Sequence, residues 1–272
     1  MELTKLNSKF PNKCAFITGA GSGLGTAFAK LLAANHWTLH LSDINEATLS
    51  ETSELLAHQT TVYTYILDVS NRNQYEQVHQ KVIRNSPQID LVINNAGIGD
   101  AALFKEYTLA NWEKMIHINL LGTFYGCHFF TPTLLSQQSG LIINVGSAAG
   151  FMNSPGASAY NVSKAGVFSL SETLYHELKP HNVHVSVVTP TFFKTNLMDG
   201  ANGSKRLKNS AEKQMKHSKT NAHKVAATAL IEAAKGTFQI IHPSNAKRMY
   251  FLKKWFPSFI NKQYKKMMEK IS

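Results

Sequence analysis

The sequence contains few cysteines and no long apolar segment. Its 272 residues include only two cysteines, Cys14 and Cys127, which lie far apart and outside any CxxC or His/Cys cluster. This argues against a disulfide framework and a metal site, and it fits a reducing compartment. No uncharged apolar run reaches the roughly 18 residues that a membrane-spanning helix needs. The N-terminal stretch is polar and lacks the apolar core of a signal peptide, so a cytoplasmic location is expected.

Acidic residues are also scarce. The chain has 17 Asp and Glu against 28 Lys and Arg, a formal charge of +11. Much of the excess lies in residues 247–270, which contain eight basic residues and one Glu. Hydrophobic content of 43% and charged content of 17% are otherwise typical of a folded globular chain.

Short apolar runs alternate with amphipathic segments along the chain. We expect strands at 13–18, 37–43, 61–67, 89–97, 140–147, 183–190 and 236–243. Helical segments follow them, including a long one at 108–136 that Pro132 should bend or shorten. This alternation predicts an α/β fold with a doubly wound, parallel, seven-stranded Rossmann-like sheet in a single domain. The domain is expected to span 1–244, with an irregular substrate lid at about 191–220 and a basic aromatic helical extension at 245–272.

A glycine-rich turn follows the first expected strand. It reads Gly19-Ala20-Gly21-Ser22-Gly23-Leu24-Gly25 and precedes an amphipathic helix. Strand, glycine turn and helix together form the context of a dinucleotide-binding fingerprint. The glycines let the backbone approach a pyrophosphate, and the helix N-terminus supplies N–H groups. The spacing from Thr18 is TGxxxGxG rather than the plain GxGxxG.

Asp43 ends the second expected strand. A carboxylate there would accept hydrogen bonds from the adenosine ribose hydroxyls and repel a 2′-phosphate. Neither Ser22 nor Ile44 offers a positive charge to such a phosphate, so NAD is favoured over NADP. Alternatively, Asp43 simply caps the following helix.

Tyr160 and Lys164 are four residues apart, a spacing that puts both side chains on one helix face. A nearby ammonium lowers the pKa of a phenol from ~10, so that it can exchange a proton with an alcohol or carbonyl oxygen. Ser147, at a strand end, would hold that same oxygen. Asn119 lies within a predicted helix, where Asn is mildly unfavourable, and it suggests a need for side-chain hydrogen bonds. An isolated YxxxK pair is usually a half-buried aromatic and a solvated lysine, so a catalytic role for this pair depends on the surrounding motifs.

In order and spacing, these motifs resemble the short-chain dehydrogenase/reductase family over about residues 10–240. The resemblance rests on Thr18-Gly19, Gly23, Gly25, Asp68, Asn94-Asn95-Ala96-Gly97, Asn119, Ser147, Tyr160 and Lys164. One departure is visible, because the turn after the sixth strand reads Pro190-Thr191 where the family usually has Pro-Gly.

The resemblance implies a role for each position. The pyrophosphate would contact the turn Gly19, Ser22, Gly23, Leu24 and Gly25; the adenosine would contact Asp43, Asp68 and Val69; the rest of the cofactor would contact Asn95, Ala96, Gly97, Pro190 and Thr195. Tyr160 would be the general acid/base, and Ser147 would orient the substrate oxygen. Lys164 would bind the nicotinamide ribose and lower the pKa of Tyr160, and Asn119 would hold a water in a proton relay to Lys164.

The function expected from this set is that of an NAD(P)-dependent oxidoreductase acting on CH–OH groups, assembled as a homodimer or homotetramer. The alternative is a non-catalytic NAD(P)-binding sensor or scaffold, which would not need Ser147, Tyr160 and Lys164 together. An apolar small-molecule substrate is favoured by the side chains expected around it, namely Phe104, Phe151, Met152, Phe192, Phe193, Leu197 and Met198.

Aromatic and basic residues alternate in the extension at 245–272, which Pro257 divides. Three alternatives stay open. The segment is a helix pair that closes over the substrate pocket or a subunit interface, or it is a peripheral contact with anionic lipid. Binding to nucleic acid is the third, and it is not expected, because no reading motif accompanies the basic residues.

Overall fold

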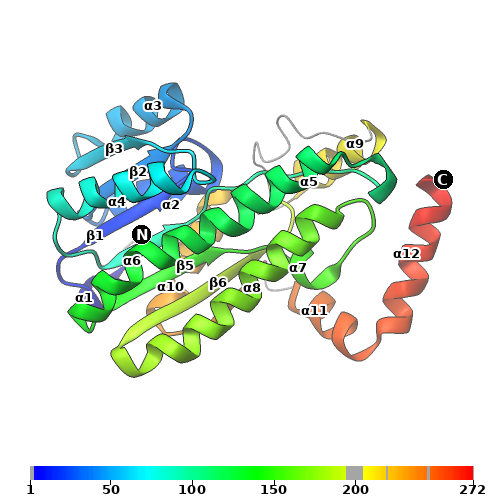
Figure 1. Ribbon diagram of the computed structural model, residues 1–272. Coiled ribbons are helices and arrows are strands. Elements are labelled where there is room, and N and C mark those ends of the chain that lie inside the picture. The colour runs from blue at the N-terminus through cyan, green and yellow to red at the C-terminus, as the bar shows by residue number, and fades with distance from the viewer. Residues whose placement is uncertain (1–2, 194–204, 219, 244–245, 272) are drawn as a thin grey trace.

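The computed structural model describes residues 3–193, 205–218, 220–243 and 246–271. At its centre lies one parallel sheet with the strand order β3-β2-β1-β4-β5-β6-β7, which confirms the predicted doubly wound arrangement (Figure 1). The strands are β1 Cys14–Thr18, β2 Thr38–Asp43, β3 Val62–Ile66, β4 Leu91–Asn94, β5 Gly140–Val145, β6 Val183–Pro190 and β7 Gln239–His242.

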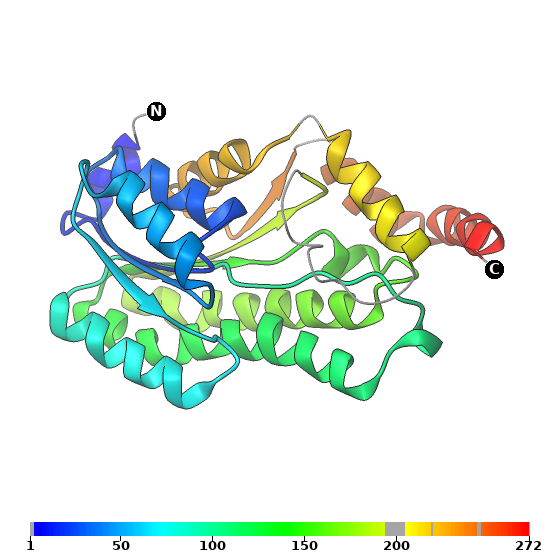
Figure 2. The ribbon, with the colours of Figure 1, turned by 90° about the horizontal axis from the view of Figure 1, so that it is seen from above.

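Helices cover both faces of this sheet (Figure 2). One face carries α1 Thr4–Lys9, α2 Gly23–Ala33, α3 Glu46–Leu56 and α10 Ala222–Ala234. The other carries α4 Arg72–Asn85, α6 Gly122–Gln137 and α8 Ser158–Leu178. The central strands are buried on both faces, which is why they read as continuous apolar runs.

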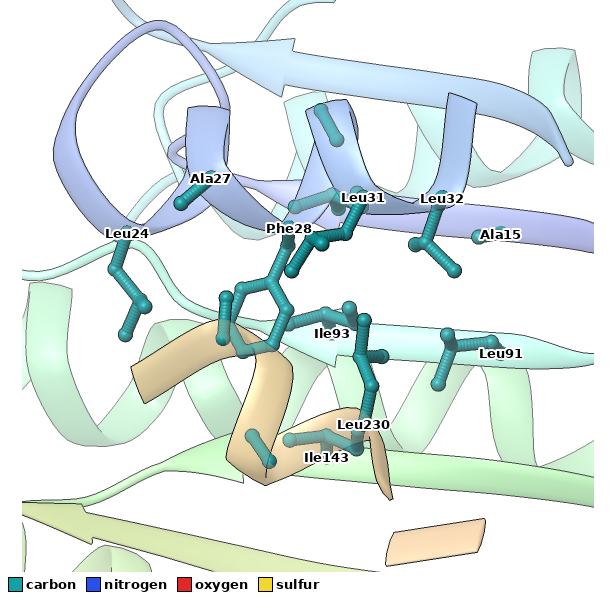
Figure 3. Packing of buried hydrophobic residues seen from close by; sticks show 14 of the residues in the cluster. Ala15, Leu24, Ala27, Phe28, Leu31, Leu32, Leu91, Ile93, Ile143 and Leu230 are labelled. Carbon is teal, nitrogen blue, oxygen red and sulfur yellow. The ribbon is translucent and has the colours of Figure 1, made fainter. Parts of the chain in front are cut away.

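Phe28 of α2 occupies the space between the sheet and α10. It is fully buried and packs in one cluster with Ile93 of β4, Ile143 of β5 and Leu230 of α10 (Figure 3). Full burial of a side chain of this size contributes about 1.5–3 kcal/mol. This packing fixes α2, and with it the glycine turn that precedes α2.

The expectation of a long helix at 108–136 is wrong in one respect. Pro132 does not shorten it, because α6 continues to Gln137 and buries Phe130 and Leu134 on either side of the proline. The burial of these side chains offsets the roughly 3 kcal/mol that proline costs inside a helix. The interruption lies earlier, where a π-helical turn, His117–Leu121, separates α6 from α5 Leu109–Ile116.

Three further helices were not anticipated from the sequence. The N-terminal α1 buries Leu3, Leu6 and Phe10 in the core. The four-residue α7 Ala149–Met152 follows β5. The segment 191–220, expected to be irregular, contains α9 Lys205–Lys216. This helix buries Leu207 and Met215 beside Ala101, and the packing stabilises it.

The basic extension forms two helices, α11 Ala246–Trp255 and α12 Pro257–Ile271, divided at Pro257 as expected. The 3₁₀ turns Phe104–Glu106 and Lys179–His181 complete the elements. Within the described ranges, no helix combines the length and the apolar character that crossing a bilayer requires.

Candidate active site

Close packing around Gly19 and Gly25 shapes the turn after β1. Gly19 has a φ of +64°, and a Cβ there would lie 2.9 Å from the Cα of Ala96. A Cβ on Gly25 would overlap the carbonyl group of Gly19. Only glycine therefore lets the turn fold back against the start of α2 and the end of β4.

Asn95 holds this turn to the end of β4. Its side-chain amide donates to the carbonyl oxygens of Thr18 and Gly19, at 2.9 and 3.0 Å. In return, the hydroxyl of Thr18 accepts from the backbone N–H groups of Asn95 and Ala96, both at 3.0 Å. Four hydrogen bonds thus join the ends of two adjacent strands at the point where the strand order reverses, which is where open α/β sheets bind ligands.

Asp43 braces the turn from the other side. Its carboxylate accepts from the N–H of Gly21 at 2.9 Å and from the N–H of Asn45 at 3.0 Å. The alternative that Asp43 merely caps α3 is wrong, because Asn45 is the N-cap and accepts from the N–H of Thr48. The carboxylate of Asp43 instead lines a cleft.

This cleft runs along the carboxyl ends of the strands. Most of the predicted cofactor-binding residues line it together: Gly19, Ser22, Gly23, Leu24, Asp43, Asp68, Val69, Asn95, Ala96, Gly97, Tyr160, Lys164 and Pro190. Gly25 lies against the turn, as described above, and is not itself among the lining residues. Thr195, Leu197 and Met198 lie outside the described residues. Within the described part of the chain, no group of three or more His, Cys, Asp or Glu side chains is arranged to hold a metal ion.

Asn119 lies in the π-helical turn and is completely buried. Its Oδ1 accepts from the N–H of Ile98 at 2.8 Å, and its Nδ2 donates to the carbonyl of the same residue at 2.9 Å. A Cβ on Gly97 would lie 3.0 Å from this Oδ1 and 3.5 Å from Lys164 Nζ. The side-chain amide therefore braces the backbone beside Lys164, and the water relay that the resemblance implies stays a prediction. Single π turns recur at functional sites.

Tyr160 and Lys164 lie one turn apart on α8, and Ser147 follows β5. Lys164 Nζ donates to the carbonyl of Val145 at 2.9 Å and lies 5.9 Å from the centre of the Tyr160 ring. The backbone N–H of Ala149 donates to Ser147 Oγ at 3.1 Å. The hydroxyl of Ser147 lies near the Tyr160 phenol and favours its ionised form.

The electrostatics of this pair differ from the sequence-based expectation. Burial raises the pKa of Tyr160, and the nearby hydroxyl of Ser147 only partly opposes this. Burial also lowers the pKa of Lys164 to about 8. The expected lowering of the Tyr160 pKa by Lys164 is therefore wrong here, because desolvation of the phenolate dominates and the ammonium hydrogen-bonds a backbone carbonyl.

Several residues of the cleft were not singled out from the sequence. Leu67, Ile98, Ile118, Val145, Gly146 and Phe193 also line it. Most of them stand within a few residues of a strand's carboxyl end, and that position is the signal that would have found them. Thr18 was noted only as part of the glycine motif, although its hydroxyl accepts two backbone hydrogen bonds.

Comparison with known proteins decides the family. A sequence model described as short chain dehydrogenase matches residues 13–206. The chain belongs to the short-chain dehydrogenase/reductase family. It is 35% identical over 188 residues to the 3-oxoacyl-[acyl-carrier-protein] reductase FabG of Thermotoga maritima, covering 69% of this chain and 76% of that protein. This membership makes the protein part of a family of oxidoreductases.

Solved structures of the family agree with the fold. A short-chain dehydrogenase/reductase from Burkholderia phymatum in complex with NAD superposes with a TM-score of 0.86 at 30% identity, covering 90% of this chain and 94% of that one. A short-chain dehydrogenase from Sphingobium yanoikuyae in complex with NADPH has a TM-score of 0.77 at 24% identity, covering 91% and 95%, and shares the fold alone. Because neighbours hold either nucleotide, the comparisons do not support a preference for NAD.

Proposed function

We propose that this protein transfers a hydride between a nicotinamide dinucleotide and an alcohol or carbonyl substrate. The observation that carries the proposal is one continuous cleft lined by the glycine turn, Asp43, Tyr160 and Lys164. The residues fit such a cofactor, since a Cβ on Gly19 would meet Ala96 and one on Gly25 would meet Gly19, so that glycines alone allow the tight turn whose N–H groups would hold the pyrophosphate. When bound, the nicotinamide supplies or accepts the hydride.

Tyr160 is the proposed general acid/base. Because burial raises its pKa, the phenol keeps its proton at neutral pH and is suited to donate it to a carbonyl oxygen during reduction. In the oxidation direction the phenol must first release its proton to solvent, and the resulting phenolate then takes the proton of the alcohol. Ser147, close to the phenol of Tyr160, would donate to the substrate oxygen where negative charge develops.

Lys164 supports this chemistry through its position. Its ammonium is held by the carbonyl of Val145 at 2.9 Å, beside Gly97 and one helical turn from Tyr160. With a pKa lowered to about 8, it is positively charged at neutral pH and also able to release a proton. We infer that it binds the nicotinamide ribose and passes protons toward solvent, with Asn119 bracing the backbone that leads there.

We infer a preference for NAD over NADP from Asp43 alone. Its carboxylate lines the cleft where the second strand ends, and Ser22 and Ile44 line the same part of the cleft. None of these side chains offers a positive charge to a 2′-phosphate, and the carboxylate repels one.

The proposed substrate carries an apolar body next to its reacting oxygen. Ile98 and Phe193 line the cleft, and Met152 is buried in α7, a few residues beyond Ser147. A lid at about 191–220, a division at 244/245, a homodimer or homotetramer, and a cytoplasmic location stay predictions that accompany this proposal.

The competing function is that of an NAD(P)-binding sensor without turnover. To separate the two, the purified protein is incubated with NADH or NADPH and a panel of ketones and aldehydes, and with the oxidised cofactors and the matching alcohols. Nicotinamide absorbance reports turnover, and protein fluorescence reports binding. We expect turnover with at least one apolar substrate. Tight cofactor binding with no turnover across the panel would favour the sensor.

A further inference from the structure

The two C-terminal helices contact the body of the protein at α7, near Ser147. The ring of Tyr250 on α11 packs edge-on against Phe151, with centroids 4.9 Å apart. The hydroxyl of Tyr264 on α12 donates to the carbonyl of Met152 at 2.7 Å. Both contacts are with α7, which follows Ser147 directly. The helices are thus attached to the body, and their position is defined.

The outer face of the same helices exposes aromatic side chains at the turn between them. This aromatic elbow consists of Phe251, Trp255, Phe256 and Phe259, whose exposed fractions are 54%, 62%, 54% and 52%. The ring centroids of Phe251 and Trp255 are 6.4 Å apart, and those of Phe251 and Phe256 are 6.2 Å apart. Clustered apolar exposure of this kind marks an interaction surface rather than ordinary scatter.

Basic residues flank the aromatic elbow along the sequence. Residues 247–268 contain no acidic side chain and seven basic ones: Lys247, Arg248, Lys253, Lys254, Lys262, Lys265 and Lys266. Lys254 Nζ lies 5.6 Å from the Trp255 ring, so charge and aromatic surface share one location. Two copies of such a surface repel each other, which argues against self-association and for a partner of negative charge.

We propose that the aromatic elbow and its lysines bind an anionic lipid surface. The elbow is a turn between two helices, and α12 projects from the end of the molecule (Figures 1 and 2). A projecting turn can bring its rings to a flat bilayer without obstruction from the rest of the fold. Aromatic rings enter the headgroup region, while lysines extend to the anionic headgroups around them. This binding mode needs no membrane-spanning helix.

Co-sedimentation with vesicles tests the proposal on the full chain and needs no turnover, so its outcome is independent of the proposed function. We expect the protein to pellet with vesicles of phosphatidylcholine containing phosphatidylserine, to pellet far less with phosphatidylcholine alone, and to be released by raised salt. Trp255 fluorescence should shift to shorter wavelength on binding. The variant Trp255→Phe should bind the vesicles with the same affinity but should not show this fluorescence shift.

Variants of the aromatic elbow and of the lysines supply the decisive comparison. Phe251→Ser/Trp255→Ser/Phe259→Ser should weaken binding by about tenfold or more. Lys254→Glu/Lys262→Glu/Lys265→Glu should do the same, since each basic residue near the surface contributes about fivefold. The matched controls are Leu55→Ser, at an apolar side chain of α3 that is 47% exposed, and Lys30→Glu/Lys81→Glu on α2 and α4. Both should bind as the unmodified protein does.

Four results would overturn the proposal. The first is an unmodified protein that stays in the supernatant with both kinds of vesicle. The second is an aromatic elbow variant that binds as tightly as the controls. The third is a change of molar mass in solution caused by the elbow substitutions, which would assign the surface to a second copy of the chain. The fourth is retention on duplex DNA or RNA with no binding to vesicles.

Discussion

Replacing Asp43 with asparagine isolates the charge on which the proposed preference for NAD rests. The side-chain oxygen of asparagine can still accept one of the N–H groups of Gly21 and Asn45, which the carboxylate accepts at 2.9 and 3.0 Å. The substitution removes the negative charge that a 2′-phosphate would face. For charges about 5 Å apart at a half-buried site, with an effective dielectric constant between 20 and 80, that repulsion is about 1–3 kcal/mol.

The assay is a pair of dissociation constants, for NADH and NADPH, measured by titration calorimetry on both proteins. Damage to the turn itself affects both cofactors equally, so the ratio of the constants reports what Asp43 does at the 2′ position, namely its repulsion of the phosphate and its hydrogen bond to the hydroxyl. We expect the ratio of the NADPH constant to the NADH constant to fall by about 5- to 150-fold in Asp43→Asn. Glu46→Gln, which removes an exposed charge in the first turn of α3, is the control and should leave the ratio unchanged. A ratio unchanged in Asp43→Asn would refute the reasoning.

Two further predictions concern the buried groups beside Tyr160. Burial lowers the pKa of Lys164 to about 8, so the folded state binds this proton less well than the unfolded chain and its stability rises as pH increases above 8. In urea titrations, the free energy of unfolding of the unmodified protein should therefore rise by about 2 kcal/mol between roughly pH 8 and pH 9.5, relative to that of Lys164→Met. If the free energies of both proteins changed equally with pH, the result would argue against a buried ammonium. Asn119→Ala leaves the N–H and the carbonyl of Ile98 without their partner, and urea unfolding should show a loss of about 2–5 kcal/mol. Thr108→Ala, a single exposed cap of α5, should cost only about 1 kcal/mol, and a loss no larger in Asn119→Ala would contradict the bracing role.

Much of the fold follows from periodicity in the sequence. Parallel strands covered on both faces must be apolar throughout, and β6 was predicted at 183–190, the bounds that the structure gives. The elements that were missed depend on distant contacts. For α9 that contact is the packing of Leu207 and Met215 beside Ala101, although its residues are mostly good helix formers without Gly or Pro.

The π turn around Asn119 is a second such case. Its sequence, HINLL, is compatible with an ordinary α-helix. Only the hydrogen bonds of Asn119 to Ile98, 21 residues away, explain why the π turn occurs at this position. The candidate site was accessible from sequence to the extent that residue types and spacing define it. Which residues gather in the cleft follows from their positions at strand ends.

The electrostatics of the site were not accessible in this way. Spacing suggested that Lys164 lowers the pKa of Tyr160, whereas burial raises that pKa. Burial is a sum over side chains from several elements, and no local pattern encodes it. Similarly, Asp43 and Asn45 are equally good helix caps by residue type, and only the geometry shows that Asn45 is the cap.

The central claim is that Tyr160 exchanges the proton of the substrate oxygen, and Tyr160→Phe tests it most directly. Turnover with the best substrate and the dissociation constant of the cofactor are measured on the same preparations. Tyr125→Phe on α6, away from the cleft, serves as the control. We expect turnover to fall by about 10²–10⁴-fold in Tyr160→Phe while cofactor affinity changes by less than about threefold. Turnover close to that of the Tyr125→Phe control would contradict the account.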